Sequence, residues 1–400
     1  MTLLAVDDAQ ARLLASVTPL PAETVALADA AGRYLAADCV ALRTQPPFAA
    51  AAMDGYAIRW VDRAGPWQVI GTAAAGRGFA GTVGAGQAVR ILTGAPLPAG
   101  SDALVIQEDI ARDGDMLRLT GDGPPAAGLH IRRAGLDFAA GDVLGRASER
   151  LGAARLGLLA AGGHGTVPVH ARPVVALLAT GDELVPPGVM PGPDQIVSAN
   201  GAMLGAMFTA AGARVLDGGI VADDRAALAT AIRAHAHADL LVTIGGASVG
   251  DHDLVLPVLQ ELGAEIDFWK VAVRPGKPML AGRLGAMPVV GLPGNPVSAY
   301  VCALLFVVPM LRRLTGDPAP LPMTVTARLG AALAANGARR DHLRATLADG
   351  VVTPAATQDS SMLRVLAIAD ALIVRLPGAP VAAAGEIVDC LLLDTVPPVA

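Results

Sequence analysis

Short apolar runs alternate with segments of helical periodicity between residues 172 and 264, and this is the clearest pattern in the chain. The runs PVVALLATG, ARVLDGGIV and ADLLVTIGG have the length and composition of buried strands. The segments SANGAMLGAMFTAAGA, DRAALATAIRAHA and DHDLVLPVLQELGA predict helices. Strands that alternate with such helices indicate a mostly parallel sheet covered on both faces. Because ligands of these sheets bind beyond the carboxyl ends of the strands, we expect the site in the loops that follow them.

The flanking regions have different patterns. Residues 5–44 predict helices in DDAQARLLASV and TVALADAAGRYLA, and SERLGAARLGLLAAGG (148–163) predicts one amphipathic helix that ends at glycines. Between them, runs such as WQVIG, AVRILTG and DALVIQED are separated by Gly, Pro and Asp, which indicates a small β-rich domain. From residue 318 onwards, MTVTARL, HLRATLADG, ALIVRL and EIVDCLLL predict a terminal β domain.

One stretch resembles a membrane span. No charged residue occurs from Leu284 to Leu311, and a span needs about 20 apolar residues. Proline and glycine interrupt this stretch at residues 292–296, so the remaining run, 297–311, is shorter than a span. We expect it to be a buried helix packed on a sheet, in a protein that does not cross a membrane.

Composition limits the possible functions. A chain of 400 residues predicts two to four domains. Its net charge of -6 argues against a general nucleic-acid or anionic-membrane surface, since either needs a basic excess. The three cysteines, Cys39, Cys302 and Cys390, form no metal-binding or disulfide pattern, which fits a reducing compartment. The N-terminal segment lacks the basic stretch of a secretory signal, so we expect a cytoplasmic protein.

Carboxylates and glycines follow the predicted strands. Asp182 and Glu183 end the first strand and could bind a hard cation or a hydroxyl-bearing ligand. For this motif alone, we favour the simpler interpretation that Asp182 caps the turn and Glu183 is solvated. The third strand runs into GGASVG (245–250) and then DHD (251–253), where backbone N–H groups could receive phosphate. A role in packing and capping is equally consistent with that motif.

Cations and a second loop come next. The segment FWKVAVRPGKP (268–278) contains Lys270, Arg274 and Lys277, and its RPGKP part predicts a tight turn that concentrates cations for an oxyanion. The alternative is a solvated basic loop. The following GLPGNP (291–296) leads into a helix whose unpaired N–H groups we expect to form a second anion receptor.

The β-rich region has its own candidates. Asp54 lies in AMDGYA, which is also a turn signal, and Thr93 lies in RILTGAPLP. Further polar residues are Gln107, Glu108, Asp109, Arg132, Arg133 and Asp137. The histidines show no metal-binding spacing, and no Ser/His/Asp or Cys/His arrangement is present.

Seven motifs in a fixed order resemble the MoeA family of molybdopterin molybdenumtransferases, which includes the E domain of gephyrin. They are AMDGYAIR, RILTGAPLPAGSDALVIQED, IRRAGLDFAAGD, LLATGDELV, TIGGASVGDHD, WKVAVRPGKP and GLPGNPVSA. The resemblance covers nearly the whole chain and is far more specific than a single glycine loop.

The resemblance implies an α/β multidomain protein. Its domains are an elongated, discontinuous helical segment (1–44 and 142–171), a β-rich domain (45–141), a molybdopterin-binding-type α/β domain with a mostly parallel sheet (172–317) and a C-terminal β-barrel (318–400). It also implies a homodimer whose active cleft lies between the α/β domain of one subunit and the β-rich domain of the other. Other proteins of molybdenum cofactor biosynthesis are implied partners. The implied reaction inserts molybdate into adenylylated molybdopterin, with Mg²⁺-dependent loss of AMP.

The resemblance also assigns roles to residues by motif position. Asp54, Glu183 and Lys277 are implied catalytic residues. Arg274, Lys277, Arg339 and Ser360 would bind molybdate, and Asp223, Asp251 and Asp253 would bind Mg²⁺. The implied substrate-binding residues are Thr93, Asp182, Gly245, Gly246, Ser248, Gly250, Lys270, Pro293, Gly294 and Asn295.

Three departures from the family pattern bear on activity. Ala49, Ala50 and Ala51 replace the usual Asp-Asn-Ser, Arg364-Val365 replaces a Ser pair, and Arg274 stands where many relatives have lysine. In this alanine-rich chain we interpret the alanines as drift at tolerant loop positions. Three hypotheses remain: an active molybdenumtransferase, a scaffold that holds molybdopterin without turnover, and a related transferase that uses tungstate.

Overall fold

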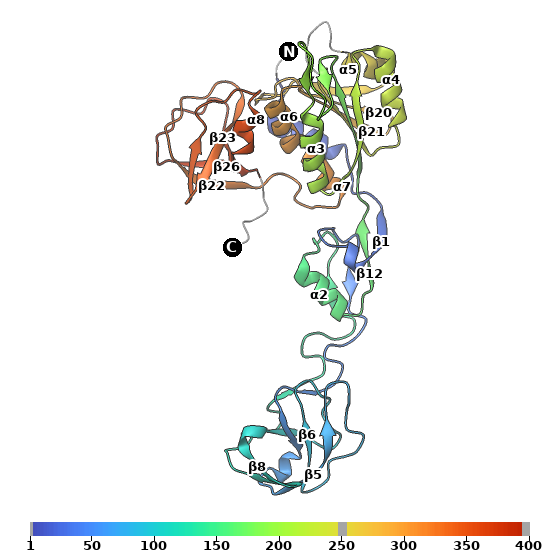
Figure 1. Cartoon of the computed structure of the whole chain (residues 1–400), viewed down its shortest axis with the longest axis vertical. Coiled ribbons are helices and arrows are strands. Elements are labelled where there is room, and N and C mark those ends of the chain that lie inside the picture. Colours follow the sequence, from blue (N-terminus) through green and yellow to red (C-terminus); the bar gives the residue numbers. More distant parts are fainter. Residues whose placement is uncertain (1–2, 247–253, 394–400) are drawn as a thin grey trace. The chain divides into compact units, whose positions relative to one another are not determined.

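The computed structural model describes residues 3–246 and 254–393 (Figure 1). The chain divides into two compact units. The first contains Met1–Glu23, Gly32–Ala36 and Pro168–Ala400, and the second contains Thr24–Ala31 and Ala37–Val167. Both units are therefore built from segments that are far apart in the sequence.

A six-stranded sheet organises the first unit. Its first four strands are parallel, and the last two run antiparallel to their neighbours. Strands β17 and β21 are buried along their whole length, as expected for strands covered on both faces. This confirms the mostly parallel α/β domain. The order across the sheet is β16 (Arg214–Val221), β13 (Val174–Thr180), β17 (Leu240–Ile244), β21 (Met287–Leu292), β20 (Leu280–Leu284) and β18 (Glu265–Trp269).

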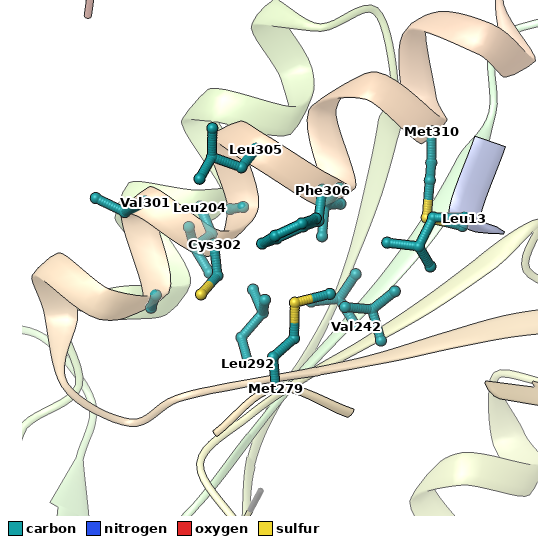
Figure 2. Packing of buried hydrophobic residues seen from close by; sticks show 14 of the residues in the cluster. Leu13, Leu204, Val242, Met279, Leu292, Val301, Cys302, Leu305, Phe306 and Met310 are labelled. Carbon is teal, nitrogen blue, oxygen red and sulfur yellow. The ribbon is translucent and has the colours of Figure 1, made fainter. Parts of the chain in front are cut away.

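Helices cover both faces of this sheet. Alternate residues of β13 belong to different cores: Val175 packs in one cluster and Ala176 in the other. The first cluster includes residues of α1 (Val6–Ala15) and α3 (Asn200–Ala210), and Figure 2 shows Phe306 between Leu204 and Leu13. The second cluster includes residues of α4 (Arg225–Ala234) and α5 (Val255–Glu261).

The long apolar segment is a core helix. It runs from Pro296 to Leu314 as α6 (Pro296–Cys302), a π-helical stretch η4 (Ala303–Val307) and α7 (Val308–Leu314). Its mean hydropathy of 1.7 and its length would allow a membrane span, but 72% of its most apolar window is buried inside the protein. Burial against the sheet thus explains its composition, as the sequence predicted.

The C-terminal residues form a closed barrel. Strands β23, β24, β22, β26 and β25 follow one another in the sheet, and β25 also pairs with β23, which closes the ring. A short strand from the α/β domain, β19 (Val273–Arg274), joins β23 in parallel. The bounds are β22 (Thr324–Leu329), β23 (Arg340–Ala348), β24 (Val351–Pro354), β25 (Ala371–Arg375) and β26 (Ile387–Leu392), with α8 (Leu363–Ala367) between β24 and β25.

The second unit is rich in strands, as expected. Its six-stranded sheet has the order β7 (Ala103–Ile106), β4 (Gly55–Ile58), β6 (Gln87–Ile91), β5 (Trp67–Ala73), β9 (Met116–Leu119) and β8 (Ile110–Asp113). The unit also has the helix α2 (Ala153–Ala161) and 3₁₀ turns η2 (Trp60–Asp62) and η3 (Gln107–Asp109). Two-stranded sheets in this unit are β2 (Cys39–Val40) with β11 (Val143–Gly145) and β3 (Ala50–Ala51) with β10 (Ile131–Arg132). Elsewhere in the described residues, β1 (Ala22–Ala26) pairs with β12 (Thr166–His170), and in the first unit β14 (Leu184–Val185) pairs with β15 (Ile196–Val197).

Two predicted helices differ from the structure. The segment TVALADAAGRYLA is not an α-helix: its first residues end strand β1, and a single 3₁₀ turn, η1 (Leu27–Asp29), follows. The β-branched pair Thr24-Val25 favours the strand, which gains backbone hydrogen bonds from β12. The helix predicted over 148–163 begins only at Ala153, because Ser148 has a left-handed backbone (φ 66°) and Gly152 is extended.

Candidate functional site

A cavity of about 270 Å³ lies where the RPGKP turn meets the barrel. We call it the oxyanion pocket. It brings together four residues that the sequence assigned to molybdate: Arg274, Lys277, Arg339 and Ser360. These residues come from three separate segments, so only the fold makes them neighbours. The complete lining is Arg274, Pro275, Gly276, Lys277, Pro278, Ser298, Arg339, His342, Leu343, Gln358 and Ser360.

The RPGKP turn is held from both sides. Strand β19 pairs with β23, which places Arg274 opposite Asp341. On the other side, the buried Cys302 thiol donates a hydrogen bond to the Gly276 carbonyl oxygen at 3.4 Å. A Cβ on Gly276 would lie 2.3 Å from the Cys302 sulfur, and the backbone there has φ 111°. Glycine is therefore the residue that lets the turn approach α6 this closely.

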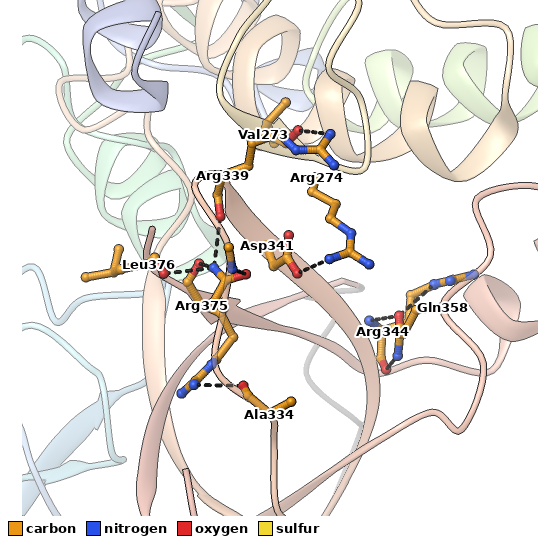
Figure 3. Close-up of polar contacts among 11 residues, drawn as sticks. Val273, Arg274, Ala334, Arg339, Asp341, Arg344, Gln358, Arg375 and Leu376 are labelled. Atoms are coloured by element: carbon orange, nitrogen blue, oxygen red, sulfur yellow. Dashed lines mark hydrogen bonds and ion pairs between the residues drawn. The ribbon is translucent and has the colours of Figure 1, made fainter. Parts of the chain in front are cut away.

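The charges of the pocket are arranged around one buried carboxylate. Arg274 donates to Asp341 Oδ2 at 3.2 Å, while Arg339 donates to the Val273 carbonyl oxygen at 3.5 Å (Figure 3). The side chain of Arg274 is 58% exposed and that of Asp341 only 9%. Burial raises the pKa of Asp341, and the nearby Arg274, Arg339 and Arg375 partly oppose this. With Lys277 also present, the pocket presents three cationic side chains to its contents.

Two further groups, His342 and Gln358, form part of the pocket wall. Burial lowers the pKa of His342 to about 4, with a further contribution from the Arg340 charge, so the imidazole is neutral near pH 7. Gln358 accepts from the backbone N–H of Arg344 at 3.0 Å, and its amide donates to the Arg344 and Ala355 carbonyl oxygens (Figure 3). These hydrogen bonds hold the Gln358 side chain in one orientation, so this part of the wall is ordered before an anion arrives.

The loops after the parallel strands form the second predicted feature. Asp182 and Glu183 follow β13 and are exposed, and Asp182 Oδ1 accepts the backbone N–H of Asp223, which follows β16, at 3.0 Å. This bond ties the loop after β13 to the loop after β16, and a role of Asp182 in capping its own turn stays a prediction. Gly245 has φ 86°, and a Cβ there would lie 2.8 Å from the Thr180 carbonyl oxygen. The glycine thus lets two strand ends lie close together.

The GLPGNP loop links the loops after the parallel strands with the oxyanion pocket. The Asn200 amide donates to the Gly294 carbonyl oxygen at 2.7 Å, and the Asn295 amide donates to Ser360 Oγ at 3.2 Å. The backbone N–H of Val297 donates to the Ser360 carbonyl oxygen at 3.1 Å. The expected anion receptor at the start of α6 is therefore wrong for this amide, because the barrel already satisfies it.

The acidic residues allow a test of the predicted magnesium site. Ser248, Gly250, Asp251 and Asp253 lie outside the described residues. Within the described residues, no group of three or more His, Cys, Asp or Glu side chains could hold a metal ion. Mg²⁺ usually keeps several waters and uses only one or two carboxylates together with substrate phosphates. Asp182 and Asp223 lie next to each other at the sheet edge, because the backbone N–H of Asp223 donates to the Asp182 carboxylate, and two carboxylates match the number that such a site uses.

Lys270 lies apart from the other two cations of its segment. Its ammonium stands 4.2 Å from the centre of the Trp269 ring. Both residues line a second cavity of about 620 Å³, whose other walls include Leu4 and Phe268. Lys270 therefore does not join Arg274 and Lys277 in the lining of the oxyanion pocket.

Asp54 is held firmly in the second unit. Its Oδ1 accepts hydrogen bonds from the backbone N–H of Thr93 at 2.7 Å and from the Thr93 hydroxyl at 2.8 Å. These two bonds lower the pKa of Asp54, and the charge of Arg90 adds to the effect. Arg90 in turn donates to the Tyr56 hydroxyl at 3.1 Å and to Gln107 at 3.0 Å. The carboxylate is thus ionised, oriented and close to solvent.

The alanines before Asp54 are part of the core. Ala50 and Ala51 form β3, pair with β10 and are 6% and 0% exposed. The backbone N–H of Ala51 donates to Ala95, and Ala49 accepts from Leu97. The interpretation as tolerant loop positions is therefore wrong for Ala50 and Ala51. A small apolar side chain fits where the strand packs against Ala57 and Val89.

Sequence reasoning missed several residues of the site. The oxyanion pocket is also lined by Ser298, His342 and Gln358. In addition, Asp341 accepts a hydrogen bond from Arg274, and Asn200 donates one to the Gly294 carbonyl oxygen. Ser298 lies inside the quoted GLPGNPVSA motif, so the motif could have indicated it. The others follow from barrel closure and loop contacts, for which no local sequence signal exists.

Comparisons with known families cover most of the chain. Residues 4–163 match the MoeA N-terminal region (domain I and II), and residues 176–313 match the probable molybdopterin binding domain. Residues 326–393 match the MoeA C-terminal region (domain IV). These three matches occur in the order that the motifs predicted.

Individual relatives agree with the family matches. The chain is 36% identical to the molybdopterin molybdenumtransferase of Haemophilus influenzae over 323 residues, which cover 79% of this chain and 78% of that protein. It is 35% identical to molybdopterin molybdenumtransferase 1 of Mycobacterium tuberculosis, with 97% and 98% covered. A crystal structure of the MoeA protein from Pyrococcus horikosii matches with a TM-score of 0.85 and 31% identity, covering 98% of this chain and 99% of that one. The chain belongs to the MoeA family.

Proposed function

We propose that this protein is a molybdopterin molybdenumtransferase, which inserts molybdate into adenylylated molybdopterin and releases AMP. The observation that carries the proposal is the oxyanion pocket, where Arg274, Lys277 and Arg339 stand beside the Ser360 hydroxyl. A tetrahedral dianion needs fixed cations and hydrogen-bond donors, and this pocket offers both. The names of the curated relatives support the same function.

The crevice beyond the parallel strands is the proposed place of the pterin nucleotide. Ligands of such sheets bind beyond the carboxyl ends of the strands, where Gly245 and Gly246, both with left-handed backbones, pack the end of β17 against Thr180. Asn295 links the loops at this edge to the oxyanion pocket. Asp223 would hold Mg²⁺ together with Asp251 and Asp253, the three residues that the family positions imply, and Asp182 lies next to Asp223. The ion would neutralise charge on the phosphoanhydride when bound.

The proposed reaction has two parts. Water attacks one phosphorus atom of the phosphoanhydride, the bond from that phosphorus to the bridging oxygen breaks, and the products are AMP and the phosphate of molybdopterin. The two dithiol sulfurs form bonds to molybdenum, and their two protons leave with one oxygen of the oxyanion as water. Lys277 and Arg274 hold the oxyanion, Glu183 lies at the crevice edge, and the ionised Asp54 orients water or substrate at the reacting end.

A homodimer is part of the proposal, with Asp54 acting on substrate held by the other subunit. Mixing Asp54→Asn with Lys277→Ala protein tests this point. After subunit exchange, each heterodimer has one intact site, so the mixture should recover about one quarter of wild-type activity. A mixture that stays as inactive as its components, although exchange is shown by labelled subunits, contradicts it.

The direct test of the function is incubation with adenylylated molybdopterin, molybdate and magnesium. We expect AMP release and formation of molybdenum cofactor, with no release when molybdate or magnesium is left out. Tight substrate binding without AMP release would instead indicate the scaffold. The same assay with tungstate in competition decides which oxyanion is used, since both are tetrahedral dianions.

A further inference from the structure

We infer that Asn295 is a positioning residue for the oxyanion pocket: its amide orients the Ser360 hydroxyl so that the hydroxyl proton is donated to the bound oxyanion. The inference rests on the proposed function, because it concerns how the same pocket recognises its anion. It assigns Asn295 a role different from direct contact with the pterin nucleotide. The inference is based on the two hydrogen bonds that join the GLPGNP loop and the start of α6 to Ser360, in the loop before α8.

The geometry fixes Ser360 at two points. The Asn295 amide donates to Ser360 Oγ at 3.2 Å, and the N–H of Val297 donates to the Ser360 carbonyl oxygen at 3.1 Å. Ser360 lines the oxyanion pocket, whereas Asn295 does not. Within the described part of the chain, the Ser360 hydroxyl accepts this one bond and has no acceptor of its own. Its proton is therefore left for the contents of the pocket.

Hydroxyl chemistry gives the direction of the effect. A serine hydroxyl has one proton and two acceptor sites. An amide N–H at one acceptor site excludes rotamers that point the proton toward Asn295, so the proton faces away from the loop. A donor that itself accepts a hydrogen bond is also polarised and becomes a stronger donor. A dianion surrounded by three cations gains from such a fixed neutral donor.

The anchoring of the loop provides a matched control. Asn200 also donates its amide to the GLPGNP loop, at the Gly294 carbonyl oxygen 2.7 Å away, but it has no bond to Ser360. Asn200→Ala and Asn295→Ala each remove one amide bond from the same loop. Only the second removes the bond to the serine hydroxyl, so the pair separates loop order from hydroxyl orientation.

The test is a double-mutant cycle read by calorimetric titration with sodium molybdate. Ser360→Ala should weaken binding about 10-fold or more, because it removes a hydrogen bond to a charged ligand. Asn295→Ala should weaken it about 3- to 10-fold, and the double variant should match Ser360→Ala alone. Thermal unfolding of each variant shows whether the chain is folded. Effects that multiply in the double variant would mean that Asn295 acts independently of Ser360, which overturns the inference.

A nearly isosteric replacement gives a second, independent measurement. In Asn295→Asp the new carboxylate accepts the hydrogen bond of the Ser360 hydroxyl and adds negative charge. Molybdate affinity should therefore fall further than in Asn295→Ala. In the AMP-release assay, both replacements should raise the KM for molybdate while the KM for adenylylated molybdopterin stays within twofold, a split that a general loss of structure would not give. Equal losses in Asn200→Ala and Asn295→Ala, or a raised KM for the pterin nucleotide instead, would overturn the inference.

These outcomes separate the inference from the proposed function. If wild-type protein binds no molybdate, the pocket assignment fails and the inference fails with it. If wild-type protein binds molybdate but the cycle is additive, only the inference fails. If the cycle is non-additive but no AMP is released, the proposed turnover fails while the positioning role of Asn295 stands.

Discussion

The oxyanion pocket presents positive charge, whereas the site formed by Asp54 and Thr93, which we call the Asp54 corner, presents negative charge. The pocket holds Arg274, Lys277 and Arg339 against a wall with a buried carboxylate and a neutral imidazole. The Asp54 corner holds a single carboxylate near solvent with two bonds from Thr93. The first arrangement is suited to retain an anion, and the second keeps an acid ionised through the two Thr93 donors and the charge of Arg90. Binding and turnover should therefore be separable by substitution.

The largest expected effect is on turnover. Asp54→Asn keeps the shape and the bond from the Thr93 N–H but removes the charge, so AMP release should fall about 100-fold or more. The pKa of wild-type Asp54 is lowered from its usual value of 3.8, so the carboxylate is ionised throughout the range from pH 5 to 8. Protonation of Asp54 should therefore not reduce the rate at the acid end of that range. The exposed Asp113→Asn in the same unit is the control. A normal rate for Asp54→Asn would show that the charge is not used.

Loss of a pocket cation should act on binding instead. Lys277→Met keeps the apolar stem and removes the charge, which should weaken molybdate binding about 10-fold in a titration. Lys270→Met is the matched control, because its ammonium lies on Trp269 in the other cavity. We expect it to change molybdate affinity less than twofold. An equal loss in both variants would place Lys270 in the oxyanion pocket and contradict the separation of the two cavities.

The buried imidazole should make the first unit sensitive to acid. The pKa of His342 is lowered to about 4 in the folded state, so the unfolded chain binds more protons between pH 4 and 6.5. The free energy of unfolding is therefore highest above about pH 6.5, where both states of His342 are neutral, and it falls as the pH drops. When the pH is lowered from 7 to 5, the free energy of unfolding of the wild type, measured with denaturant, should fall by about 2 kcal/mol more than that of His342→Gln. Parallel curves for the two proteins would mean that His342 is not buried in neutral form.

The smallest effect concerns the alanines of β3. Ala51→Ser buries a hydroxyl at a position with 0% exposure and should lower the free energy of unfolding of the second unit by about 1 kcal/mol. The partly exposed Ala49→Ser should cost less than half of that. Thermal and denaturant unfolding measure both. A larger loss at residue 49 than at residue 51 would contradict the burial of β3.

The sequence predicted the elements that depend on periodicity and turn chemistry. Strands β13, β16 and β17 and the buried helix from Pro296 follow from apolar runs and their punctuation. The four molybdate-assigned residues came from motif order, and the fold gathers them in one cavity. The family matches confirm the motifs, although the role of each site residue stays a prediction.

What the sequence could not predict depends on contacts between distant segments. The bond from Val297 to Ser360 removes one amide from the anion receptor that the loop alone suggested, and strand pairing buries Ala50 and Ala51. The separation of Lys270 from Arg274 depends on how β19 joins the barrel. In each case a tertiary partner satisfies or covers a group that looks available in the sequence.

AMP release measured over a range of molybdate concentrations tests the central claim most directly, with wild type, Asp54→Asn and Lys277→Met side by side. We predict molybdate-dependent release by wild type, a much lower rate at unchanged KM for molybdate in Asp54→Asn, and a raised KM for molybdate in Lys277→Met. No release by wild-type protein with substrate, molybdate and magnesium present would contradict the proposed function. A raised KM for molybdate in Asp54→Asn would contradict the separation of binding from turnover.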